Sequence, residues 1–151
     1  MAISMDLVKQ LRVETGARIL DCKKALEKAD GDLALAKKYV EEKGLARAEK
    51  KADRETGVGY IASYTHITGS IAAMVELLCE TDYVAANDEF RQLAKDLAMQ
   101  VVAMSPANKE ELLAQDFIKG DATVEMTVKA LSGKIGEKMT LSRFERFAVG
   151  Q

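Results

Sequence analysis

Residues 70–102, SIAAMVELLCETDYVAANDEFRQLAKDLAMQVV, change from the pattern of one secondary structure to that of another. The first part is mostly apolar, which is typical of a buried strand. The last part repeats apolar residues every three or four positions, which predicts an amphipathic helix. Asn87 can cap the start of that helix, and Ser105-Pro106 ends it. This stretch therefore predicts a domain of the α+β class, in which a strand leads directly into a long helix.

The residues before this stretch predict a hairpin. VGYIASYTH (58–66) alternates in polarity, and ITGS (67–70) has the composition of a turn. Two antiparallel strands are therefore expected, the first over 58–66 and the second over 70–79.

The chain after the long helix is harder to interpret. Residues 107–121 show no clear pattern, and a helix is expected near 123–133. KMTLSRFERFAV (138–149) predicts a strand with a bulge, because the parity of its apolar residues shifts. Residues 57–151 are thus predicted to form a core domain, a small antiparallel sheet with helices packed against it.

Residues 1–45 contain three short helical patterns separated by glycines. Asp32 can cap the start of the third helix, and Gly16, Gly31 and Gly44 end the three helices in order. Each helix alone is too short to be stable in water, so the three must pack together. The sequence therefore predicts an N-terminal three-helix module.

Residues 46–56 lose the apolar stripe and gain charge, which predicts a linker between domains, either extended or helical. Basic residues in and before it could contact phosphates, but acidic residues dilute them and no aromatic ring is present for base stacking. These basic residues are Lys43, Arg47, Lys50, Lys51 and Arg54. A solvated face is the simpler interpretation, and a nucleic-acid-binding adaptor that uses the basic linker is the alternative function.

The composition argues against several classes of protein. The chain has 151 residues, a formal net charge of −2, two cysteines and one histidine. This charge gives no overall attraction to nucleic acid or to an anionic membrane, and no apolar run is long enough to span a bilayer. The cysteines and the histidine lack the spacing of a zinc site. Two reduced thiols and an N-terminus without a secretory pattern predict a cytoplasmic protein.

Catalytic motifs are weak in this sequence. GVGYIA (57–62) contains two glycines, but a nucleotide-binding loop needs a strand before it and a helix after it. His66 and Cys79 could meet across neighbouring strands, yet no nucleophile motif supports such a dyad. Asp82 has no second carboxylate at a defined spacing for acid–base chemistry. We therefore expect no enzymatic activity, no cofactor, no metal site and no direct nucleotide binding.

The junction CETDYV (79–84) admits two interpretations. In the first, Thr81 or Asp82 caps a helical turn and Tyr83 covers the edge of the core. In the second, the junction is a protruding tip whose aromatic ring and carboxylate enter a cleft of a partner. The physical chemistry of the residues favours the first interpretation and leaves the second open.

Three long motifs resemble those of a known family. LVKQLRVETGARILDCKKALEKADGDLALAKKYVEEKGLARAEKKADR (7–54) is similar to the N-terminal module of bacterial elongation factor Ts. LLCETDYVAANDEFRQLAKDLAMQV (77–101) resembles the hallmark segment of that family, N-C-(Q/E)-T-D-F-V-A. IGEKMTLSRFERF (135–147) resembles its C-terminal I-G-E-N-I…R-R-F motif. These blocks appear in the same order as in the family and span nearly the whole chain, which is identified as a short-form member.

The resemblance implies a guanine nucleotide exchange factor for elongation factor Tu, the GTPase that delivers aminoacyl-tRNA during translation elongation. It implies that a ubiquitin-associated-like helical module and the core domain both bind Tu, in its GDP-bound and nucleotide-free states. It also implies that Asp82 and Tyr83, framed by Thr81 and Val84, insert near the magnesium and phosphate site of Tu and promote GDP release. In the module, the partner contacts that it implies are Arg12, Ile19, Leu20 and Lys23.

The chain departs from the family pattern at several places. Tyr83 replaces a phenylalanine, and its hydroxyl needs a hydrogen bond if it is buried. RIL (18–20) replaces Gly-Met-Met in the module, which keeps bulk but loses the adaptability of methionine. The extra core and coiled-coil segments of longer members are missing between Pro106 and Gly120. A single small sheet leaves exposed edges, and short-form relatives suggest self-association, so a homodimer is expected.

Overall fold

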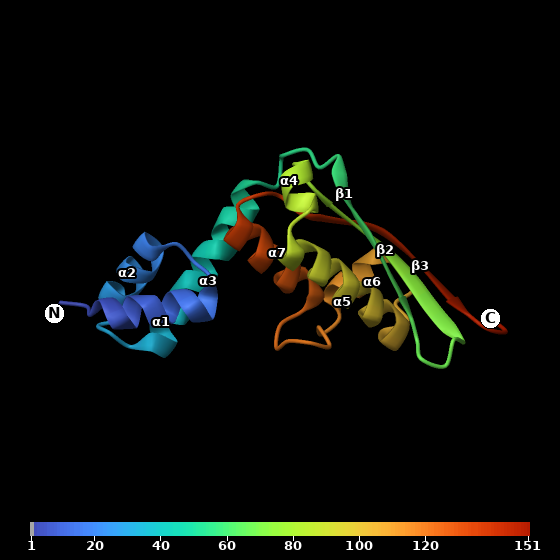
Figure 1. The fold of residues 1–151 in the computed structure, drawn as a ribbon, viewed down its shortest axis with the longest axis horizontal. Coiled ribbons are helices and arrows are strands. Elements are labelled where there is room, and N and C mark those ends of the chain that lie inside the picture. The colour runs from blue at the N-terminus through green and yellow to red at the C-terminus, as the bar shows by residue number, and fades with distance from the viewer. Residues whose placement is uncertain (1) are drawn as a thin grey trace.

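The computed structural model describes residues 2–151, with a helical module at one end and a sheet at the other (Figure 1). Three helices form the N-terminal module: α1 (Met5–Thr15), α2 (Ile19–Lys28) and α3 (Leu33–Lys50). Capping side chains fix the start of α1 and of α3. The hydroxyl of Ser4 accepts a hydrogen bond from the N–H of Leu7, and Asp32 caps α3 in the same way. The three predicted helices are confirmed.

The module has a hydrophobic core of its own, because all three helices turn an apolar face inward. Its buried side chains are Val8, Leu11, Cys22, Ala25, Leu26, Ala29 and Ala36. The core is small, and it needs all three helices to close it.

The third helix continues past the point where the sequence predicts its end. Gly44 lies within α3, which runs on to Lys50 through the first residues of the predicted linker. Glycine inside a helix costs roughly 0.5–1 kcal/mol relative to alanine. Here its backbone packs against Gly133 of α7 (Val124–Ile135). The prediction that Gly44 ends the helix is wrong, because helix packing outweighs the local signal.

The core domain is built on a three-stranded antiparallel sheet in the order β1-β2-β3. β1 (Val58–Thr65) and β2 (Ile71–Cys79) form the predicted hairpin, and β3 (Thr140–Ala148) pairs with the other side of β2. The predicted α+β class is confirmed: three helices precede a small antiparallel sheet packed with helices.

The predicted bulge is present in the last strand. Glu76 of β2 pairs with Arg143 of β3, whereas the next residue, Leu77, pairs with Leu141. Ser142 is therefore an extra residue on β3, and it restores the inward position of the apolar side chains on both sides of the bulge.

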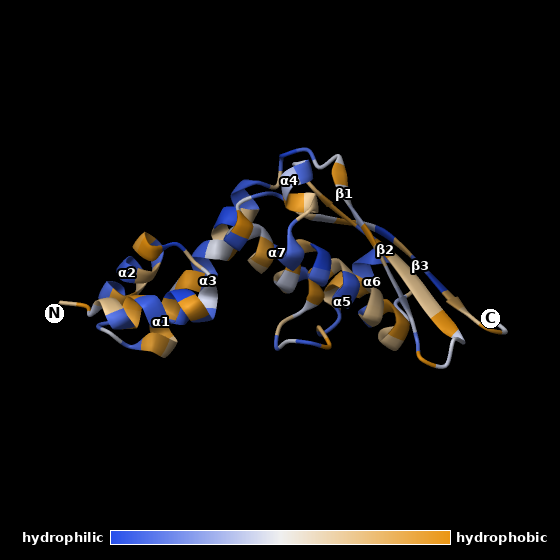
Figure 2. Cartoon of the chain, viewed as in Figure 1, coloured by the Kyte–Doolittle hydropathy of each residue, from blue (hydrophilic) through white to orange (hydrophobic). Residues whose placement is uncertain are grey.

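Helices cover one face of the sheet (Figure 1). α4 (Asp82–Ala85) follows β2, and α5 (Asp88–Met104) packs against β1 and β2. Hydrophilic and hydrophobic bands alternate along α5 in Figure 2, as expected of a helix with one buried side. Asn87 caps α5 as predicted, and Ser105 ends it in the left-handed conformation. The largest side chains fully buried against the sheet are Phe90, Leu97, Val101, Val75 and Leu77.

One buried polar side chain helps to fix the segment after α5. A short helix, α6 (Lys109–Ala114), is followed by a loop that leads to α7. The side-chain amide of Gln100 donates a hydrogen bond to the carbonyl of Asp116 at 3.0 Å and accepts one from the N–H of Ile118 at 2.8 Å. Because these contacts join residues that are distant in the sequence, no local pattern predicts the path of this segment.

The face of the sheet away from α5 is open. Ile61, Met74 and Phe147 project from it, and Phe147 is 72% exposed. β1 and β3 are both edge strands.

None of the helices in residues 2–151 is long and apolar enough to cross a membrane.

Candidate functional site

The CETDYV junction forms a short helical tip between β2 and α5. β2 ends at Cys79, and α4 begins at Asp82 with Thr81 as its N-cap. The hydroxyl of Thr81 accepts a hydrogen bond from the N–H of Val84 at 3.3 Å. Val84 is buried in the core, whereas Tyr83 is 88% exposed. The ring of Tyr83 therefore projects from the tip instead of covering the edge of the core.

A single carboxylate, that of Glu137, holds the base of the tip. It accepts hydrogen bonds from the N–H groups of Glu80 and Thr81, at 3.1 and 3.0 Å, and from the hydroxyl of Thr81 at 2.7 Å. Glu80 binds in the opposite direction, and its carboxylate accepts a hydrogen bond from the N–H of Lys138 at 2.7 Å. Hydrogen bonds to ionised groups are stronger than neutral ones. These reciprocal contacts fix the backbone from which the tip projects.

Glu137 reaches the tip because α7 ends just before it. Gly136, in the left-handed conformation with φ of 97°, is the C-cap of α7 and reverses the direction of the chain. The hydroxyl of Ser132 donates a hydrogen bond to the carbonyl of Glu137 at 2.6 Å. No motif in the sequence marks Glu137 as a functional residue. The available signal was an acidic residue directly after a helix-ending glycine in IGEKM.

The thiol of Cys79 lies beneath the tip and donates a hydrogen bond to the carbonyl of Thr81 at 3.2 Å. Burial raises the pKa of Cys79, and the carboxylates of the tip raise it further, so the thiol stays protonated at neutral pH. Cys79 pairs with Val58 at the start of β1, whereas His66 follows the end of that strand. The two side chains are therefore at opposite ends of the hairpin and form no dyad.

A second exposed surface lies where α1 ends and α2 begins. Leu20 is 69% exposed and Ile19 is also exposed, and the charged residues Arg12 and Lys23 are on the same two helices. Val13, which was not among the predicted contacts, is 86% exposed and follows Arg12 in the sequence. Exposed aliphatic side chains with charged residues near them in the sequence are candidates for partner contacts. We call these five residues the module face.

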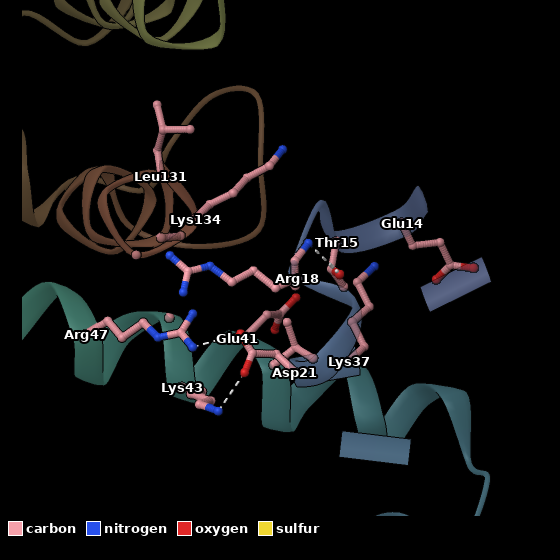
Figure 3. A pocket seen from close by; sticks show the side chains of 15 residues that line it. Glu14, Thr15, Arg18, Asp21, Lys37, Glu41, Lys43, Arg47, Leu131 and Lys134 are labelled. Atoms are coloured by element: carbon pink, nitrogen blue, oxygen red, sulfur yellow. Dashed lines mark hydrogen bonds and ion pairs between the residues drawn. The ribbon is translucent and has the colours of Figure 1, made fainter. Parts of the chain in front are cut away.

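Asp21 joins α2 to α3 behind the module face. Its carboxylate accepts hydrogen bonds from the amine of Lys43 and from the guanidinium of Arg47, both at 2.7 Å (Figure 3). Burial acts to raise the pKa of Asp21, but the two hydrogen bonds outweigh it and hold that pKa below the usual value. The orientation of α2 on α3 is therefore fixed by a buried, doubly paired carboxylate.

The same contacts occupy much of the basic linker. Lys43 and Arg47 bind Asp21, and Arg54 forms an ion pair with Glu80 at 3.4 Å. Burial, together with the nearby cation of Arg54, lowers the pKa of Lys51. Three of the five basic residues are thus paired with carboxylates of the protein, which weakens the nucleic-acid alternative.

The structure therefore separates the predicted site residues into two groups. The tip holds Thr81, Asp82, Tyr83 and Val84 in one turn, and the module face holds the others on α1 and α2. Figure 1 shows α4 at the upper edge of the core and α1 and α2 at the N-terminal end. Among residues 2–151, no group of three or more His, Cys, Asp or Glu side chains could hold a metal ion.

Comparison with known proteins defines the class of this chain. The family model described as Elongation factor TS matches residues 80–151, which include the tip, α5 and β3. Elongation factor Ts of Thermotoga maritima is 46% identical over 149 residues, which cover 97% of this chain and 75% of the relative. That of Leptospira biflexa is 48% identical over 139 residues, 91% of this chain and 69% of the relative. That of Thermosipho melanesiensis is 37% identical over 195 residues, 99% of this chain and 100% of the relative.

The regions that match these translation factors include the helical module, the small sheet and the projecting tip between β2 and α5. The chain belongs to the elongation factor Ts family. Its role is in protein biosynthesis, at the elongation step of translation.

Proposed function

We propose that this chain is a guanine nucleotide exchange factor that promotes GDP release from elongation factor Tu. The observation that carries the proposal is the tip: Tyr83 is 88% exposed on a backbone fixed by Glu137. Because the backbone beneath this exposed aromatic ring is held, the tip has little backbone freedom left to lose on binding. Such a ring is suited to act as the anchor of an interface.

In the proposed mechanism, Asp82 and Tyr83 enter the partner beside its magnesium and phosphate site. The ring of Tyr83 fills a cleft, and the carboxylate of Asp82 competes for the magnesium ion or for the backbone amides that hold the phosphates. Thr81 and Val84 take part by fixing the tip, through the cap and through burial in the core. No bond is made or broken, so the protein is not an enzyme.

Thermodynamic linkage sets what the contacts must do. The chain binds nucleotide-free Tu more tightly than Tu with GDP, and GDP binding must weaken by the same factor. Each tenfold weakening requires about 1.4 kcal/mol of difference between the two complexes. Contacts made equally in both states contribute nothing to exchange.

The module face is the second contact with Tu. Ile19 and Leu20 supply exposed aliphatic area, and Arg12 and Lys23 supply charge that speeds and orients association. Two contacts on one body bind more tightly than either alone, because the first raises the effective concentration of the second.

A second copy of the chain occupies the open face of the sheet. Ile61, Met74 and Phe147 are exposed there, and the edge strands β1 and β3 each have one side without a partner strand. We expect this factor to be cytoplasmic and to sediment as a homodimer. Phe147→Asp should shift it to monomer, while Ile67→Asp, which is in the hairpin turn and off this face, should not. A monomeric parent would contradict the homodimer.

The direct test of the proposed function is the release of labelled GDP from elongation factor Tu, followed with and without this chain. We expect release to accelerate in proportion to the chain added and then to saturate. Unchanged release at every concentration would refute exchange activity. Salt-dependent binding of RNA in the same buffer would then favour the nucleic-acid alternative.

A further inference from the structure

The module meets the core where α3 crosses α7, and the crossing is unusually close. A Cβ atom added to Gly133 would lie 2.0 Å from the carbonyl oxygen of Gly44 and 2.7 Å from its Cα. Real Cβ atoms do not approach backbone so closely, and backbone cannot rotate away as a side chain can. The two helices therefore contact each other through their main chains, and only glycine at 133 permits this.

A second contact supports the crossing. Gly16, in the turn between α1 and α2, lies against the side chain of Lys134. The amine of Lys134 forms an ion pair with Glu89 of α5 at 2.9 Å. The turn between α1 and α2 therefore packs against the side chain of Lys134, which the ion pair with Glu89 holds in place.

Beside the crossing the packing is incomplete. A cavity of about 260 Å³ separates the α1–α2 turn from α7, and Glu41, Leu131 and Gly133 are among the residues that line it. In Figure 3 the side chain of Arg18 extends across this space toward α7. Because this cavity leaves the α1–α2 turn loosely packed against α7, the position of the module depends mainly on the contact between α3 and α7.

The helix α7 also carries the support of the tip. It ends at Gly136, and the next residue is Glu137, whose carboxylate binds the backbone of Glu80 and Thr81. One helix end therefore holds the module on one side, through Gly133, and the tip on the other. The distance between the module face and Tyr83 depends on this helix.

We propose that Gly133 is a positioning residue for nucleotide exchange, because it fixes the module face relative to the tip. The inference rests on the proposed function. Any side chain at 133 must push α3 away from α7, and this displacement moves the module face. The tip and the hydrogen bonds that Glu137 makes to it stay intact. The two contacts then no longer match the partner together, and the effective concentration of the second contact falls.

Gly133→Ala and Gly44→Ala form a matched pair for the test. A Cβ on Gly44 meets nothing within 4 Å, although the same glycine is half of the crossing. Gly44→Ala should therefore leave the rate of GDP release unchanged and should make α3 slightly more stable. Gly133→Ala should raise the concentration needed for half-maximal GDP release about tenfold or more. Its maximal rate at saturation should stay close to that of the parent, because the tip still enters the partner.

Two outcomes would overturn the inference. Equal half-saturating concentrations for the parent and Gly133→Ala would show that the crossing does not position the contacts. A maximal rate that falls only in proportion to the unfolded fraction would show that Gly133 merely supports stability. If Gly133→Ala does not fold, Ala48→Leu enlarges a residue one turn further along α3 that is buried outside both hydrophobic clusters. Half-maximal release at the parental concentration for folded Ala48→Leu would equally overturn it.

A distance measurement separates this inference from the exchange function. Spin labels on cysteines introduced at the exposed positions Glu27 of the module and Lys95 of α5 report the separation of the two parts. Gly133→Ala should shift or broaden the distance distribution, and Gly44→Ala should not. An unchanged distribution in Gly133→Ala refutes positioning by Gly133, whereas a parent that never accelerates GDP release refutes only the proposed function.

Discussion

The tip and the module face present side chains to a partner in two physically different ways. The tip is held by one carboxylate from a residue 57 positions further along the chain, which binds two backbone amides and a hydroxyl. The module face is held by a small hydrophobic core in which Val8, Leu11 and Leu26 are fully buried. The geometry of the tip thus depends on a few strong polar contacts, and that of the module face on many weak apolar ones.

This difference predicts how each region responds to substitution. Removing a polar support from the tip should alter its geometry more than the stability of the fold, because exposed polar groups can bind water instead. Removing an apolar support from the module should unfold the module before it alters the face. The expected loss of function decreases from the ring of Tyr83 to the support of the tip and then to the charges of the module face.

The largest effect is expected from the ring of Tyr83. Tyr83→Ala should weaken binding to nucleotide-free Tu by about 2 kcal/mol or more, as expected of an aromatic anchor. Tyr83→Phe should stay within about 1 kcal/mol of the parent, since the hydroxyl contributes one modest hydrogen bond at most. Tyr83→Leu should lie between them. A titration of Tu with all four proteins gives the order directly, and parental affinity for folded Tyr83→Ala would exclude the inserted ring.

An intermediate effect is expected from the support of the tip. Glu137→Ala should slow GDP release about tenfold, which corresponds to about 1.4 kcal/mol. The melting temperature should fall little, because the N–H and hydroxyl of the exposed Thr81 can bind water. Glu137→Gln keeps one acceptor oxygen and should lose less. Melting and exchange that fall together in both variants would instead make Glu137 a residue of the fold alone.

The smallest effect is expected from charges of the module face. Arg12→Glu and Lys23→Glu should weaken Tu binding at low salt, and the loss should shrink as salt screens the charges. Lys38→Glu makes the same charge change at an exposed position of α3 and serves as the control. Equal affinities for parent and variants at low ionic strength would remove the module face from the interface.

Much of the fold could be predicted because its signals are local. The cap at Asn87, the stripe that begins at Phe90 and the end at Ser105 define α5 from neighbouring residues alone. The bulge at Ser142 shows in the sequence because apolar parity is a local property. What escaped prediction depends on contacts between distant segments. α3 runs through Gly44, where Gly133 of α7 packs against it, and no pattern near Gly44 indicates this contact.

The candidate site divides in the same way. The residues of the tip stand out as a motif, but whether Tyr83 covers the core or projects depends on how α4 sits over the sheet. Its exposure follows from the burial of the next residue, Val84, and from the hydrogen bonds of Glu137. The role of Glu137 could not be inferred from its neighbours, because its partners belong to the junction between β2 and α4.

The most direct test of the exchange mechanism is GDP release with Asp82→Ala. Asp82 is exposed in the first turn of α4, and Thr81 already provides the cap. Its removal should therefore leave the melting curve close to that of the parent. We expect GDP release from elongation factor Tu to slow at saturating Asp82→Ala, because the carboxylate acts on the magnesium and phosphate region of the partner. A parental release rate in the folded variant would show that Asp82 only assists a helical turn and that the tip does not promote exchange in this way.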